Sequence, residues 1–197
     1  MLSSIHPFGE RSRNNRFAAT ATAYLLASIA GAATMALLAA AVGAVVSVPS
    51  DLALWLLAAG IALGLAADLG LGGLSVPSWH RQVNERWLGT YRGWVVGLGF
   101  GFQLGTGVLT IVTTSAVWST WLAAALAGSW RNALIIGVAF GIVRGGFILA
   151  TSGVHQPAQL RALHRRLAAS APAVARLTRA AVAAAGAAAV LTALVTS

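Results

Sequence analysis

Two ionisable residues lie inside long apolar stretches of the sequence. Asp68 is the single charged residue of the stretch Leu52–Leu74, and Arg144 is the single charged residue of Ala133–Ser152. A charge inside a bilayer costs at least about 2.5–3.5 kcal/mol, so we expect these two side chains to pair. Counted from the nearer helix ends, their depths are roughly 9 and 12 Å. The pair could be a substrate, ion or proton site, or a structural pair that fixes helix register.

A third polar residue, Gln103, is expected at a comparable depth of about 14 Å. The glycines around it leave a strip without side chains, which either lets another helix pack closely or lets a substrate approach the backbone. The strip consists of Gly97, Gly99, Gly101, Gly105 and Gly107. We therefore name Asp68, Gln103 and Arg144 as candidate substrate- or ion-binding residues.

Hydroxyl side chains follow this strip and have two interpretations. They either satisfy backbone groups where a long helix bends, which we favour, or line a polar path. These residues are Thr106, Thr110, Thr113, Thr114 and Ser115.

Catalytic and metal chemistry find little support in the sequence. The four histidines, His6, His80, His155 and His164, lie in separate polar segments, so we expect single surface histidines rather than a metal site. No histidine lies in an apolar stretch where it could activate a serine or threonine. The chain has no cysteine, so thiol chemistry is excluded. We expect no enzyme activity, no metal and no cofactor.

The composition indicates which kind of structural element holds these residues in place. Hydrophobic residues make up 58% of the 197 and charged residues only 9%, against about 25% charged in soluble domains. The mean hydropathy is +0.80. We predict an all-α integral membrane protein with one domain over residues 1–197. Its expected spans are Ala18–Val46, Leu52–Leu74, Trp94–Ala127, Ala133–Ser152 and about Val174–Val195.

The third of these stretches is too long for one simple span. As a straight helix, its 34 residues would reach about 51 Å, beyond a hydrocarbon core of ~30 Å. It is either one broken, tilted helix or a tight hairpin. With five spans and the N-terminus inside, arginine-rich segments collect on the cytoplasmic side and only Arg131 lies outside, as the positive-inside rule requires. A hairpin would place the arginines between Arg161 and Arg179 outside. We therefore expect five spans in the cytoplasmic membrane.

The thirteen cations are all arginines, and the formal net charge is +9. Because they flank apolar stretches, they favour anionic lipid headgroups over nucleic acid. A docking site for a partner protein is the alternative, and a homo-oligomer or a membrane complex is also open. The candidate lipid- or partner-binding residues are Arg81, Arg86, Trp87, Arg92, Arg161, Arg165 and Arg166.

A proline–arginine pattern recurs along the chain. Pro7, Arg11 and Arg16 are repeated 70 residues later as Pro77, Arg81 and Arg86, and a third copy begins at Pro157. We predict repeats over about 7–74 and 77–152, with a truncated third over about 157–197. Repeats separated by an even number of spans run in the same direction, so the repeats are expected to be parallel.

Two glycine-rich sequences carry a family resemblance. The run from Gly97 to Gly107, the run Phe140 to Gly145 and the doubled hairpins resemble the lysine-exporter-like superfamily. That superfamily includes thiol–disulfide electron carriers of cytochrome c biogenesis and sulfite-exporter-like proteins. The resemblance implies membrane transport. The electron carriers' cysteines are missing here and that family's repeats are inverted, so thiol electron transfer is not implied.

Together these patterns favour a small transporter or permease-like protein with an intramembrane polar site. The alternative is a non-catalytic membrane scaffold or subunit that docks a partner through basic cytoplasmic loops. A polar cavity that reaches Asp68 and Arg144 would favour the first, and a dry interior with an exposed basic or apolar surface would favour the second.

Overall fold

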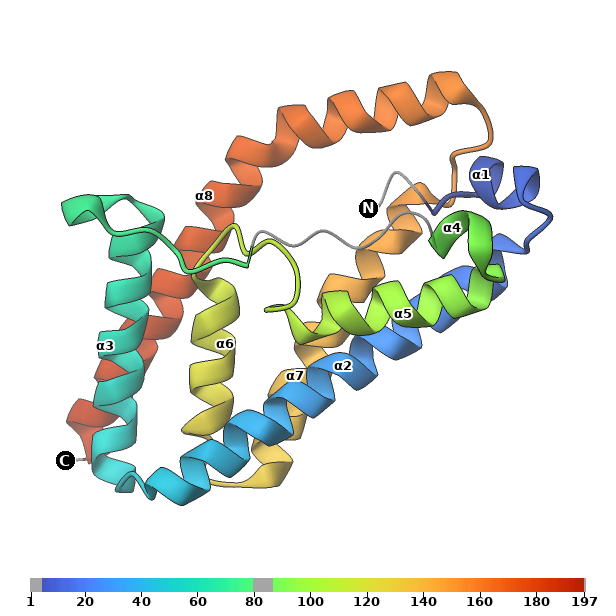
Figure 1. The fold of residues 1–197 in the computed structure, drawn as a ribbon. Coiled ribbons are helices and arrows are strands. Elements are labelled where there is room, and N and C mark those ends of the chain that lie inside the picture. Colours follow the sequence, from blue (N-terminus) through green and yellow to red (C-terminus); the bar gives the residue numbers. More distant parts are fainter. Residues whose placement is uncertain (1–4, 80–86, 197) are drawn as a thin grey trace. The chain divides into compact units, whose positions relative to one another are not determined.

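A computed structural model describes residues 5–79 and 87–196, and within these ranges every regular element is a helix. Figure 1 shows their order along the chain. The elements are α1 (Pro7–Ser12), α2 (Phe17–Val46), α3 (Ser50–Asp68), η1 (Leu71–Gly73), α4 (Trp87–Thr90), α5 (Gly93–Thr106), α6 (Ala116–Ala125), α7 (Trp130–Gly146), η2 (Phe147–Thr151) and α8 (Pro157–Thr196).

Four helical stretches are long and apolar enough to cross a membrane. They are α2, α3, α7 with η2 (Trp130–Thr151), and α8. The all-α prediction is confirmed for the described residues, and these helices are compatible with an integral membrane protein.

The third apolar stretch is not a single helix. It consists of α5 and α6, and residues 107–115 between them, called the break here, have no regular helix. At 1.5 Å per residue the two helices reach about 21 and 15 Å, each short of a ~30 Å core. The length of the stretch predicted either a broken helix or a hairpin, and both require an interruption. In the structure the interruption begins at Gly107, whose φ is 75°.

Two expected boundaries are wrong. Helix α3 ends at Asp68 rather than Leu74, because Gly70 and Gly72 adopt left-handed conformations with φ of 66° and 62°. Asp68 therefore lies at the end of its helix, and the expected depth inside it is incorrect. The helix that contains the fifth expected span begins at Pro157 rather than near Val174, so the arginine-rich segment before that span is the first part of α8 and not a loop.

The chain forms two compact units. Unit 1 contains residues 1–32, 80–110 and 138–171, and unit 2 contains residues 33–79, 111–137 and 172–197. Helices α2, α7 and α8 each contribute one part to each unit.

Unit 1 packs α5 and α7 onto α2 through glycines. A Cβ added at Gly97, Gly101 or Gly105 would collide with the carbonyl oxygen of a residue in α2, and these residues are Thr20, Tyr24 and Ser28. On α7, Gly141 and Gly145 approach the Ser28 region of α2, and Ser28 Oγ donates a hydrogen bond of 3.2 Å to the Gly141 carbonyl. This geometry supports the packing interpretation of the glycine strip.

Unit 2 is organised around the contact between α3 and α6. Gly64 of α3 lies against the side chain of Ser115, and Gly60 lies against that of Leu122. Further along the chain, Gly186 of α8 faces Ile61 of α3. Small residues thus bring the helices of this unit together as well.

Candidate functional site

The carboxylate of Asp68 holds the end of the break that precedes α6. Its Oδ1 accepts a hydrogen bond of 2.8 Å from the backbone N–H of Ser115, and its Oδ2 accepts bonds of 2.7 Å from Ser115 Oγ and 3.1 Å from Thr114 Oγ1. The carboxylate sits beside the first turn of α6, where the helix dipole favours negative charge. Asp68 thus links the end of α3 to the start of α6.

These bonds matter because the break lies in an apolar stretch. Backbone groups in a bilayer core must find partners within the protein. Ser78 Oγ accepts a hydrogen bond of 2.9 Å from the Val112 N–H, and Thr106 Oγ1 donates one of 2.8 Å to the Gln103 carbonyl. The hydroxyl residues therefore bind backbone and side-chain groups around the break, which supports their interpretation as residues of a helix interruption.

Arg144 binds the other end of the break, within unit 1. Its guanidinium donates a hydrogen bond of 3.2 Å to Thr110 Oγ1 and lies 5.5 Å from the centroid of the Phe140 ring, within cation–π range. Thr110 is buried, with 5% exposure. A hydroxyl and an aromatic ring thus partly compensate the positive charge.

Asp68 and Arg144 therefore belong to different units but bind the same short segment of chain. Each has hydrogen-bond partners in its own unit. Their mutual pairing stays a prediction. Sequence reasoning selected both residues for their charge, and it missed that each binds a hydroxyl of the break.

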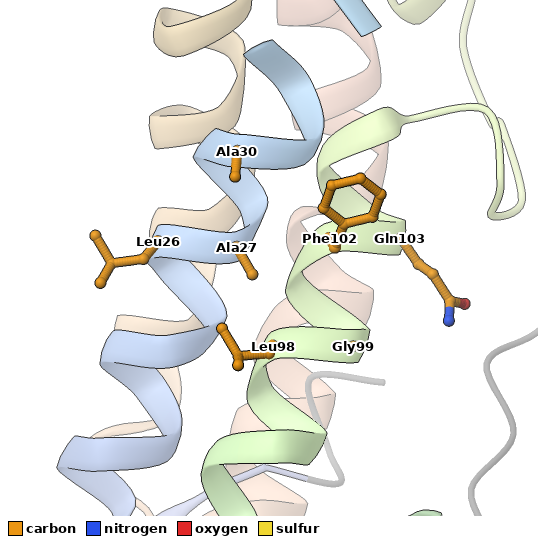
Figure 2. A pocket seen from close by; sticks show the side chains of 7 residues that line it. All are labelled: Leu26, Ala27, Ala30, Leu98, Gly99, Phe102 and Gln103. Atoms are coloured by element: carbon orange, nitrogen blue, oxygen red, sulfur yellow. The ribbon is translucent and has the colours of Figure 1, made fainter. Parts of the chain in front are cut away.

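Gln103 lies at a groove between α2 and α5. The groove has a volume of about 550 Å³ and is lined by Leu26, Ala27, Ala30, Leu98, Gly99, Phe102 and Gln103. Figure 2 shows the Gln103 amide directed away from Leu26 and Ala27. The groove is thus mainly apolar, and Gln103 supplies a polar group at one side of it. Neither Asp68 nor Arg144 lines it.

A second groove lies within unit 2. It has a volume of about 930 Å³ and is formed by the end of α2, the start of α3 and the chain between Ala123 and Trp130. Alanine and leucine dominate its lining, with Ser47, Ser50 and Ser129 as hydroxyl residues. Asp68 does not line this groove either.

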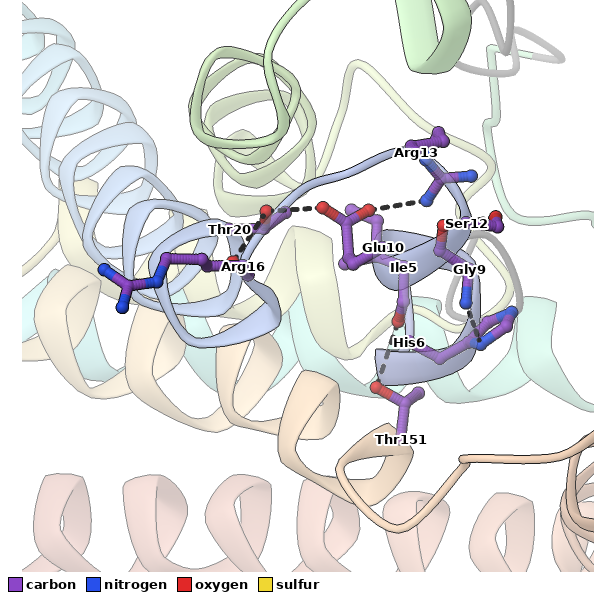
Figure 3. A network of polar contacts seen from close by, with 9 residues as sticks. All are labelled: Ile5, His6, Gly9, Glu10, Ser12, Arg13, Arg16, Thr20 and Thr151. Atoms are coloured by element: carbon purple, nitrogen blue, oxygen red, sulfur yellow. Dashed lines mark hydrogen bonds and ion pairs between the residues drawn. The ribbon is translucent and has the colours of Figure 1, made fainter.

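The N-terminal segment of unit 1 contains a polar network that sequence analysis missed. Glu10 is almost fully buried at 1% exposure, and it forms an ion pair of 2.5 Å with Arg13. It also accepts a hydrogen bond of 2.7 Å from Thr20 Oγ1. Figure 3 shows this carboxylate between α1 and the start of α2. Glu10 is one of only four acidic residues in the chain, and this scarcity was the signal available in the sequence.

His6 does not lie on the surface as expected. It is 6% exposed, and its Nδ1 accepts a hydrogen bond of 3.0 Å from the Gly9 N–H, which caps α1 (Figure 3). Burial, and then the positive charge of Arg13, lower the pKa of His6. His155 and His164 are exposed, as predicted, and His80 lies outside the described residues.

The candidate lipid- or partner-binding residues have different environments. Arg81 and Arg86 lie outside the described residues. Trp87 packs inward, with its ring centroid 5.6 Å from that of Tyr91 and 6.4 Å from that of Phe100. Arg92 is exposed next to the start of α5. The other three residues, Arg161, Arg165 and Arg166, are exposed on α8.

Comparisons with known proteins found no protein similar to this chain. No protein-family model matches the chain, and neither a curated protein nor a solved structure is significantly similar to it. Within residues 5–79 and 87–196, no three histidine, aspartate or glutamate residues form a group that could hold a metal ion. The chemistry of the break is therefore the basis for a functional assignment.

Proposed function

We propose that this protein is a small transporter or permease-like carrier of the cytoplasmic membrane, with its polar site at the break. The observation that carries the proposal is the interruption of an apolar stretch by a segment whose hydroxyls bind the two ionisable residues Asp68 and Arg144. Transporter folds place substrate and ion sites at discontinuous helices, because unwound backbone and helix ends there offer polar groups.

The residue types at the break suit a small polar or charged solute. Asp68 supplies an anionic group, Arg144 a cationic group, and Thr113 is an exposed hydroxyl residue between them in the sequence. Charged residues in membrane segments are expensive and typically mark substrate, ion or proton pathways. Gln103 lies in the last turn of α5, just before the break, and is a further candidate contact.

Access of water to the break tests this proposal. The chain has no cysteine, so a single Thr113→Cys variant in membrane vesicles can be treated with a water-soluble thiol reagent. We expect labelling, because a transport site must be reached from water. Leu38→Cys is the matched control: Leu38 is 56% exposed on α2, and we expect lipid to cover it and prevent labelling.

The scaffold hypothesis makes the opposite prediction. In a scaffold the bonds from Asp68 and Arg144 would serve only to stabilise the fold, and the grooves described above, which these residues do not line, agree with that alternative. Thr113→Cys would then remain unlabelled in intact and in opened vesicles. That result would reject the transport proposal.

We further propose five spans with the N-terminus inside, α5 and α6 forming one broken span. The support is the distribution of arginines, since this arrangement keeps the first part of α8 on the cytoplasmic side. A cysteine at Ala158 should then react only from the cytoplasmic side, and one at Ser129 only from outside. Labelling of Ala158→Cys from outside, while Ser78→Cys does not label from outside, would show that α5 and α6 form a hairpin.

A further inference from the structure

The first part of α8, residues 157–171, is called the basic segment here. It carries Arg161, Arg165 and Arg166, all exposed. The chain has no aspartate or glutamate after Glu85. Among the described residues, no hydrogen bond or ion pair neutralises these three guanidinium groups. The segment therefore presents a concentrated positive charge that has no partner within residues 5–79 and 87–196.

The length of α8 places this segment outside a membrane core. The helix has 40 residues, which corresponds to about 60 Å and so to about twice the ~30 Å hydrocarbon thickness. Beyond Arg179 the helix has no charged residue, so the C-terminal part is the one suited to cross the core. The basic segment must then lie outside the core but close to it.

The basic segment also has an apolar side. Leu160, Leu163 and Leu167 are spaced three and four residues apart, which places them on one face of the helix. Leu167 is 37% exposed. At 3.6 residues per turn, Arg161 and Arg165 lie roughly 130° and 170° around the helix from the leucine stripe, and Arg166 borders it at roughly 90°. A basic face opposite an apolar face is typical of helices that lie in a membrane interface.

We propose that the basic segment lies along a membrane surface containing acidic lipids, with its leucines in the headgroup–acyl boundary and its arginines bound to lipid phosphates. The inference rests on the membrane location in the proposed function but not on transport. Guanidinium groups bind phosphate oxygens through paired, charge-assisted hydrogen bonds. Acidic headgroups are also the nearest anions to a helix whose other half crosses the bilayer.

The test uses the full-length protein in nanodiscs, with an environment-sensitive fluorophore on Leu167→Cys. In discs containing phosphatidylglycerol we expect emission typical of an apolar environment, and in phosphatidylcholine discs or at high salt we expect emission typical of water. An arginine near an acidic surface changes the equilibrium between bound and released segment about fivefold. The triple change Arg161→Gln, Arg165→Gln and Arg166→Gln should therefore shift this equilibrium toward release by roughly 100-fold.

Two controls make the result specific. Arg131→Gln, the control for a single change such as Arg166→Gln, removes one positive charge from an exposed site at the start of α7 and should leave the spectrum unchanged. A fluorophore on Ala169→Cys, opposite the leucines, should report water in both discs. If the triple variant does not fold, Arg166→Gln alone should still give the fivefold shift. Equal spectra in the two lipids, or no effect of the arginine changes, would overturn the proposal. An apolar signal that requires an added protein would assign the segment to a protein partner and would overturn it as well.

Discussion

Two helix pairs are held together by different interactions. One is the contact between α2 and α5 in unit 1, and the other is the contact between α3 and α6 in unit 2. In the first, glycines bring two backbones together, with Gly97, Gly101 and Gly105 against α2 carbonyls. In the second, Asp68 accepts three hydrogen bonds from Thr114 and Ser115. The first contact should therefore be sensitive to side-chain volume and the second to charge and hydrogen-bonding capacity.

The largest expected effect comes from volume at the glycine contact. A methyl group at Gly101 would collide with the backbone of Tyr24, which cannot move aside without separating the helices. We expect Gly101→Ala to lower the free energy of unfolding by about 3 kcal/mol, measured as thermal or denaturant unfolding in detergent. The matched control is Gly146→Ala, where the added carbon meets nothing within 4 Å. Equal stability of the two variants would show that glycine packing does not hold α2 and α5 together.

The second effect is a loss of charge at constant size. Asp68→Asn removes the anionic acceptor of three hydrogen bonds, and we expect a loss of about 2 kcal/mol in the free energy of unfolding. Asp51→Asn makes the same chemical change at an exposed position in the first turn of α3 and should cost clearly less. A pair of variants with equal melting temperatures would contradict the assignment of Asp68 as the link between α3 and α6.

A third prediction concerns the coupling of Asp68 and Arg144. Because both residues bind the break, the effects of Asp68→Asn and Arg144→Leu should not add, and we expect an interaction free energy of about 1 kcal/mol in a double-mutant cycle. Replacing both residues by leucine should restore much of the stability if the pair is only structural. Additive losses would mean that the two residues act independently, each in its own unit.

The smallest expected effect is a difference between the two units in how their stability depends on pH. The three described histidines, His6, His155 and His164, fall within unit 1, and burial lowers the pKa of His6. The unfolded chain then binds a proton near pH 6.5 while folded His6 stays neutral, so stability is fully present above that pH and falls as the pH drops through the lowered pKa of His6. Hydrogen exchange should report this loss in α1 rather than in α3 or α6. A His6→Asn variant with an unchanged pH profile would exclude His6 as the cause.

The sequence predicted most of the helical architecture because long apolar stretches leave few alternatives. The bounds of α2 and the need for an interruption between Trp94 and Ala127 follow from hydropathy and length alone. The end of α3 did not follow, since left-handed glycines and apolar residues give the same hydropathy as a continuing helix. Hydropathy also did not reveal the first part of α8, because its arginines resemble a loop, although leucines recur there at helical spacing.

The candidate site was predictable only by residue type. Asp68 and Arg144 stood out as charges in apolar sequence, but their hydroxyl partners lie 34 to 47 residues away along the chain. Glu10 was overlooked because it precedes the first apolar stretch, where a solvated acid is the ordinary expectation. Its burial depends on Thr20 and Arg13 and on Gly93 of α5, whose missing side chain leaves space for the carboxylate.

The backbone conformation of the turn after Asp68, and not the space around it, limits which residues the turn can accept. Gly70 and Gly72 have φ values of 66° and 62°, yet a carbon added to either would meet no atom within 4 Å. An L-alanine would cost roughly 1 kcal/mol at each position because its mirror-image conformation is the favoured one. A D-alanine introduced by semisynthesis would fit the same backbone and restrict the unfolded chain, so it should raise stability. At the exit from α3, a D-amino acid is therefore expected to suit this protein better than any encoded residue, glycine included.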